Sequence, residues 1–182
     1  SFSSWTGPCD AIIGNICYAN MTSAKSVSAS FSQIMFALNV NKPGTGSGFV
    51  NSTNPPGVIN CGGTCSANLG SGTPVTLQAI ANPGSTFTGW TGAGCSGTGS
   101  CSFTMDAAQT VNATYTLNKY NLATSVTGSG TLGNNPTGTS CGANCQTYDY
   151  ATYVAVTATP SAGWSFSSWT GPCDAIIGNI CY

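Results

Sequence analysis

The feature that most restricts the fold of this chain is that its sequence repeats itself. The first eighteen residues, SFSSWTGPCDAIIGNICY, return without a change as residues 165–182, at a shift of 164. Repetition at a fixed long period is typical of tandem arrays, in which each unit mainly contacts its neighbours. The 182 residues are therefore expected to form successive repeat units rather than one or two ordinary domains.

A second, weaker periodicity lies inside the first. Two sets of residues match at a shift of 84: Met21, Val27, Ala29 and Phe31 with Met105, Val111, Ala113 and Tyr115, and Phe36, Leu38, Gly44 and Gly46 with Tyr120, Leu122, Gly128 and Gly130. The stretch from Val75 to Trp90 matches that from Val154 to Trp169 at a shift of 79. Two related units of about 82 residues therefore alternate.

These alignments predict three segments. Residues 1–35 are the C-terminal half of a repeat unit, residues 36–118 are a complete unit, and residues 119–182 are a unit that lacks its last strand. The front of the third unit, joined to residues 19–35, would rebuild a whole domain. Two explanations remain for such boundaries: the chain is an arbitrary segment of a longer periodic polymer, or a subunit whose last domain is completed by a strand from the next subunit.

The patterns inside a unit predict strands. Apolar and polar residues alternate over 36–40, 75–80, 85–90 and 110–117, and Gly, Pro and Asn separate these runs. No stretch has the pattern of an amphipathic helix. The expected fold class is all-β: tandem small antiparallel domains, β-grasp-like or small sandwiches, stapled by disulfides. Only Asn118 and Lys119 separate one unit from the next, and so short a junction predicts a rod or fibre.

Charged residues are too few for most kinds of chemistry. The chain has three Lys, four Asp, and no Arg, His or Glu. General acid-base and triad mechanisms depend on such groups, so we expect no enzyme and name no catalytic residue. Nucleic acid is excluded as a partner because phosphate binding needs clustered cations. No apolar run is long enough to span a membrane.

Ten cysteines indicate an oxidising environment and a secreted or cell-surface location. They fall in five close pairs: Cys9 and Cys17, Cys61 and Cys65, Cys95 and Cys101, Cys141 and Cys145, and Cys173 and Cys181. Neither the spacing nor the absence of His fits a zinc site, so no metal and no cofactor are expected. Glycine inside the loops favours local disulfides. Cross-pairing, such as Cys65 with Cys95, remains the alternative.

The order of motifs in residues 36–117 resembles the divergent internalin-B-type bacterial surface repeat. The motifs are a Gly-x-Gly hairpin, CGxxC, VTLxA, Pro-Gly, FxxWxG, CSGTGSC, Met-Asp-Ala-Ala and VxAxY. Residues from Tyr120 onward, continued through residues 1–34, resemble it with drift. The resemblance implies a small all-β or β-grasp-like module of secreted or surface-anchored proteins, used in tandem and without catalysis. It implies no functional residue.

Exposed aromatic and aliphatic residues are the candidate contacts. Trp5, Trp90 and Trp169 share one repeat position, which favours a core role over a sugar-stacking role. Trp164 has no counterpart in the other unit and is a candidate for a specific contact. The cysteine loops rich in isoleucine are candidate interfaces with a neighbouring unit or chain; their isoleucines are Ile12, Ile13, Ile16, Ile176, Ile177 and Ile180.

Three sequons, at Asn20, Asn51 and Asn112, are candidate N-glycosylation sites. The function that the sequence favours is a structural repeat segment of an extracellular bacterial fibre or adhesin stalk, assembling end to end, with copies of itself or adjacent repeats as partners. The alternative is an array that binds glycans or proteins through Trp-bearing loops by avidity.

Overall fold

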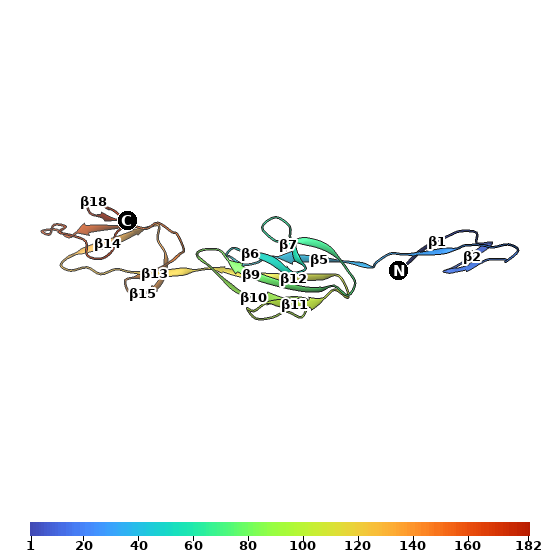
Figure 1. Cartoon of the computed structure of the whole chain (residues 1–182). Helices are drawn as coiled ribbons and strands as arrows, with labels where there is room; N and C mark the ends of the chain where they lie inside the picture. The colour runs from blue at the N-terminus through green and yellow to red at the C-terminus, as the bar shows by residue number, and fades with distance from the viewer. The chain divides into compact units, whose positions relative to one another are not determined.

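The computed structural model describes all 182 residues and contains strands but no helix (Figure 1). The predicted all-β class is therefore confirmed. Alternating β-branched and aromatic residues, interrupted every few positions by Gly, Pro or Asn, favour short strands over helical turns. No helix is present that has the length and apolar character needed to cross a membrane.

The middle of the chain forms two four-stranded sheets. Its strands are β5 (Met35–Asn41), β6 (Gly48–Asn54), β7 (Pro56–Asn60), β8 (Ser66–Gly70), β9 (Pro74–Ala81), β10 (Ser85–Thr91), β11 (Cys101–Thr104) and β12 (Gln109–Leu117). One sheet has the order β10-β12-β5-β8 and the other β11-β9-β6-β7. The strands predicted over 36–40, 75–80, 85–90 and 110–117 are confirmed.

The first and last strands of this repeat lie side by side. β12 runs parallel to β5, with Val111 opposite Val40, while β5 pairs with β8 in the antiparallel sense. The sequence predicted only antiparallel domains, so this parallel pair is an addition to the predicted fold. It arises because the chain returns to its starting edge only after six intervening strands, which no local pattern encodes. Pairing of β12 with β5 therefore joins the last strand of the repeat to its first strand.

Alternate residues of these strands form the core, as period-two patterning requires. The core residues at most 2% exposed are Leu38, Val50, Ile59, Cys61, Val75, Leu77, Trp90, Cys101, Met105, Val111, Ala113 and Tyr115. β12 supplies three of them, Val111, Ala113 and Tyr115. Burial of one large aliphatic side chain stabilises the fold by about 1.5–3 kcal/mol. The last strand is therefore a main source of stability.

Residues 119–182 repeat part of this plan. They form β13 (Lys119–Ala123), β14 (Gly130–Asn135), β15 (Thr139–Gly142), β16 (Cys145–Asp149), β17 (Ala155–Pro160), β18 (Ile176–Ile177) and β19 (Ile180–Cys181). The sheet orders are β13-β16-β15 and β14-β17-β19-β18. Only Tyr148 and Val156 are buried here. This part of the chain has a much smaller core than the middle repeat.

The first 34 residues form two separate two-stranded sheets. β1 (Phe2–Thr6) pairs with β4 (Ser28–Phe31), and β2 (Ala11–Ile13) pairs with β3 (Ile16–Tyr18), both in the antiparallel sense. Residues 165–170 have the same sequence as residues 1–6 but form no strand. One sequence thus has two local structures, and only the copy at residues 2–6 has a partner strand.

Asn118 is the single residue between β12 and β13. Its backbone N–H donates to the carbonyl of Gly84 at 2.8 Å, and its carbonyl accepts from the N–H of Tyr150 at 2.9 Å. Its side-chain oxygen also accepts a hydrogen bond of 2.7 Å from the Thr86 hydroxyl. Both backbone groups and the side-chain oxygen of the connecting residue are therefore hydrogen-bonded.

Candidate functional site

All ten cysteines are paired, and each pair is local. The disulfides join Cys9 to Cys17, Cys61 to Cys65, Cys95 to Cys101, Cys141 to Cys145, and Cys173 to Cys181. The structure holds no free thiol. Cross-pairing between loops does not occur. Each bridge therefore closes one turn or hairpin, with its two cysteines four to eight positions apart in the sequence.

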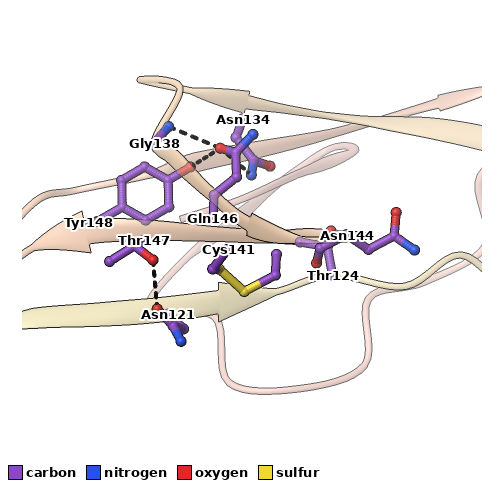
Figure 2. The surroundings of a disulfide bond; sticks show 10 residues. Asn121, Thr124, Asn134, Gly138, Cys141, Asn144, Gln146, Thr147 and Tyr148 are labelled. Carbon is purple, nitrogen blue, oxygen red and sulfur yellow. Dashed lines mark hydrogen bonds between the residues drawn. A yellow bond between two sulfur atoms is a disulfide. The ribbon is translucent and has the colours of Figure 1, made fainter.

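A network of hydrogen bonds surrounds the Cys141–Cys145 bridge (Figure 2). The side-chain oxygen of Gln146 accepts from the Asn134 amide at 3.1 Å, the Gly138 backbone N–H at 3.0 Å and the Tyr148 hydroxyl at 2.5 Å. These groups come from β14, the following loop and β16, so one carboxamide ties three segments together. The residues around this bridge are amides and hydroxyls already paired with one another, which supports a structural role.

The segments rich in isoleucine are β-hairpins rather than loops. In β2 and β3, Ile13 lies opposite Ile16, and Gly14 has the positive φ of +64° that a type II′ turn requires at its first position. Ile177 and Ile180 make the same pair in β18 and β19. The sequence signal for this hairpin is the Gly-Asn dipeptide between apolar residues, which marks a two-residue turn and not the loop that was expected.

The isoleucine side chains are largely exposed. Ile12, Ile13, Ile16, Ile176 and Ile177 are exposed by 51–65%, whereas Ile180 is half-buried. Each hairpin thus presents neighbouring β-branched side chains to solvent, which is unusual unless another surface covers them. Their role as an interface stays a prediction.

The tryptophans at the shared repeat position differ in their surroundings. Trp90 is buried, and its indole N–H donates to the Gly99 carbonyl at 2.6 Å. Trp5 and Trp169 are half-buried, each beside a phenylalanine, and their indole N–H groups have no hydrogen-bond partner. A core position was expected for all three tryptophans, but only Trp90, in the complete repeat, is fully buried.

Trp164, the tryptophan without a repeat counterpart, is 58% exposed. Its ring lies against Gly128, where an added Cβ would be 2.9 Å from Cζ3 of the indole. It also lines a cavity of about 840 Å³ formed within residues 121–181. Trp164 is therefore exposed, and its role as a contact residue stays a prediction.

The three sequons lie in different settings. Asn20 is exposed and follows β3, whereas Asn51 and Asn112 are half-buried in β6 and β12. The Asn112 side chain accepts from the Asn41 amide at 3.0 Å and donates to the Thr91 hydroxyl at 3.2 Å. Of the three asparagines, Asn20 is thus the most accessible for modification. Glycosylation stays a prediction.

Four of the seven charged side chains form two local ion pairs. Lys119 pairs with Asp149 across β13 and β16. Lys25 donates to the Asp10 carboxylate at 2.8 Å. This hydrogen bond, followed by one from the Asn20 backbone N–H, holds the pKa of Asp10 below its ordinary value. Each ion pair ties two segments of the chain together. Neither pair belongs to a cluster of acidic and basic side chains of the kind that an active site needs.

The fold and its bridges define a class of protein: small all-β units in tandem, each closed by local disulfides. Residues 50–119 and residues 120–179 each match the divergent InlB B-repeat domain, and together they cover more than half of the chain. The chain belongs to this family, in two consecutive copies. No curated protein and no solved structure matches it. Tandem copies of this domain and five disulfides indicate a surface repeat region of an extracellular or cell-surface protein.

Proposed function

We propose that this chain is a non-catalytic structural segment of an extracellular bacterial fibre or surface-adhesin stalk, which assembles end to end. The observation that carries the proposal is that two copies of the domain follow each other without a gap, at residues 50–119 and 120–179. A single residue, Asn118, connects the strands at this point. Consecutive domains with so short a connection fix the distance between the structures that they join.

Local disulfides support this mechanical role. A bridge between Cys61 and Cys65 restrains only a short turn, so it protects its repeat without linking distant parts of the chain. In the chain-entropy model a loop this short stabilises the fold by about 2 kcal/mol. For a small domain whose net stability is about 5–15 kcal/mol, that contribution is substantial.

Immunogold electron microscopy of cells that produce the protein tests the proposal. An antibody raised against the 182-residue chain should label filaments or stalks outside the cell, at regular intervals along them. Label confined to the cytoplasm, or diffuse label with no elongated structure, would contradict the structural role.

Removing one bridge is expected to make the middle repeat sensitive to protease. Cys61→Ala with Cys65→Ala should lower its free energy of unfolding by about 2 kcal/mol and raise its cleavage rate by thermolysin accordingly. Pulse proteolysis followed by mass spectrometry measures both. The matched control is Cys141→Ala with Cys145→Ala, which should leave the fragment from residue 36 to 118 intact. Equal sensitivity of this fragment in both variants would contradict a local effect of the bridge.

Lateral contacts are expected at the isoleucine hairpins. Ile12→Ser with Ile13→Ser removes exposed apolar surface, so it should weaken association of native filaments without unfolding the chain. Sedimentation of filaments as a function of protein concentration measures the effect. The control is Thr6→Ser, an exposed change outside the hairpin. Association that is unchanged by the isoleucine substitutions would assign the contact to another surface.

Binding of glycans is a second candidate function, favoured by the 58% exposure of Trp164. Exposed indoles serve as stacking platforms for sugars. A glycan panel probed with the chain and with Trp164→Ala would decide: binding that the substitution abolishes supports this function, and no binding by the unsubstituted chain excludes it for the glycans tested.

A further inference from the structure

Only one of the ten cysteines is exposed to solvent. Cys61 and Cys101 are at most 1% exposed and seven others are half-buried, whereas Cys141 is exposed. Its partner Cys145 is one of the half-buried seven. Thiol–disulfide exchange begins with attack on one of the two sulfur atoms, so access to that atom limits the reaction. The Cys141–Cys145 bridge is therefore the one that a dissolved thiol reaches most directly.

The corresponding bridge of the middle repeat has the same sequence separation but different surroundings. Cys61 follows β7 and Cys65 precedes β8, and these two strands belong to different sheets. The Cys61 backbone N–H donates to the Val50 carbonyl at 2.7 Å, and the Lys42 ammonium donates to the Cys61 carbonyl at 2.6 Å. These contacts hold Cys61 inside its repeat, where it is fully buried.

A shorter connection accompanies the exposure of Cys141. Fifteen positions separate Gly46 from Cys61, but only eleven separate the equivalent Gly130 from Cys141. In the middle repeat the longer connection allows β7 to pair with β6. In the following repeat β15 pairs with β16 instead, so Cys141 and Cys145 lie on adjacent strands of one sheet. The exposed position of Cys141 thus goes with a local difference in chain length.

Cys141 is also the residue at which the pairing of β15 is irregular. Ser140 lies opposite Gln146 and Gly142 lies opposite Cys145, so Cys141 has no opposite residue in β16. β15 is the edge strand of the sheet β13-β16-β15. A bulge in an edge strand redirects the side chain of the extra residue and interrupts the ladder locally. Breaking the bond at Cys141 therefore requires no paired residues to separate.

The strand that carries Cys145 is held by contacts that do not involve the bridge. β16 pairs with β13 over five residues, the last pair being Ala123 with Cys145. The Gln146 carboxamide accepts three hydrogen bonds, and Figure 2 shows this network beside the sulfur atoms. Opening of the bridge should therefore leave β16 in place, with Cys145 positioned to close the bridge again.

We propose that the Cys141–Cys145 bridge is a site of thiol–disulfide exchange, at which a small thiol becomes attached to Cys141. The thiolate attacks the Cys141 sulfur, a new S–S bond forms there, and the bond to Cys145 breaks. The electron pair of the broken bond stays on Cys145, which takes a proton from water. Attack by the Cys145 thiolate in the reverse direction expels the thiol and restores the bridge, so no oxidant or reductant is consumed.

Peptide mapping after exposure to glutathione tests the site. The oxidised full-length chain is incubated under native conditions with graded concentrations of glutathione, and free thiols are then blocked with N-ethylmaleimide. Mass spectrometry should find glutathione on Cys141 and the blocking group on Cys145. The Cys61–Cys65 bridge is the matched internal control, because its cysteines have the same separation. Exchange at Cys141 should be at least about tenfold faster than at this buried bridge.

Several results would overturn the proposal. They are glutathione on Cys145 instead of Cys141, equally fast exchange at the Cys61–Cys65 bridge, and faster exchange at any of the other three bridges. A chain carrying Cys141→Ser with Cys145→Ser should take up almost no glutathione under the same conditions. Uptake by this variant at the rate of the unsubstituted chain would also place the reactive site elsewhere.

Hydrogen exchange tests whether the bridge opens locally. The amides of β13 and β16 should stay as protected in the glutathione-treated chain as in the untreated chain, because their pairing does not depend on the bridge. Loss of protection throughout both strands would show that exchange requires unfolding, which contradicts a built site.

This site goes beyond the structural role proposed above, and the two can fail separately. Exchange at Cys141 in a protein that forms no extracellular filaments would retain the site and contradict the structural role. Filaments built from a chain that takes up no glutathione would retain the structural role and overturn the site.

Discussion

Val111→Asp is expected to unfold the middle repeat, while the same substitution at the equivalent Val27 leaves the isolated chain folded. Val111 is fully buried in β12, opposite Val40 of the parallel strand β5. A carboxylate there has no cation within the core to pair with, so the expected loss is about 4 kcal/mol or more. Val27 is 41% exposed, so its new carboxylate stays in contact with water, and the expected change is within about 0.5 kcal/mol.

Hydrogen exchange followed by mass spectrometry measures this difference. In Val111→Asp the amides of β5, β10 and β12 should lose protection together, because β12 lies between β10 and β5 in one sheet. Val111→Ala, which leaves no charge, should show a smaller loss of protection in the same strands. Loss of protection confined to β12 would contradict the view that this strand holds the whole repeat together.

Gly92→Ala is expected to cost far more stability than Gly171→Ala. At both positions a side chain must adopt a positive φ, which costs about 1–2 kcal/mol. At Gly92 the new Cβ would also lie 2.1 Å from the Thr110 carbonyl oxygen, a backbone atom in the paired strand β12, so β10 and β12 must separate. The total expected loss is about 3 kcal/mol at Gly92, against about 1 kcal/mol at Gly171.

Pulse proteolysis in urea gives the stability of each part of the chain from the fragments that survive. Equal costs at the two positions would show that the close approach to the Thr110 carbonyl oxygen adds nothing to the cost at Gly92.

The sequence predicted the strands of the middle repeat because their determinants are local. Alternation of apolar residues in 36–40 and 110–117 reflects which face of a strand is buried, and the Asn82-Pro83-Gly84 turn ends β9. The close cysteine pairs were predictable for the same reason, because a bridge across a few residues depends on the conformation of those residues alone. Cross-pairing was an open alternative, and the structure contains none.

Other features could not be predicted from local patterns. The parallel pairing of β5 with β12 joins residues about 70 positions apart, and nothing in either strand specifies the sense of the pair. The isoleucine segments were expected to be loops, whereas cross-strand pairing of Ile13 with Ile16 makes them hairpins. The three Gln146 contacts also depend on how β14 and β16 meet in space.

The duplicated eighteen residues show which features the sequence determines and which the tertiary structure determines. Sequence by itself determined that residues 1–18 and 165–182 are the same piece of one kind of unit, and that each carries a local disulfide and the same Trp-Thr-Gly turn. Only the tertiary structure decided that residues 2–6 form a strand and residues 165–170 do not. The physical reason is that a strand needs backbone hydrogen bonds from a partner, and only the first copy has one, β4.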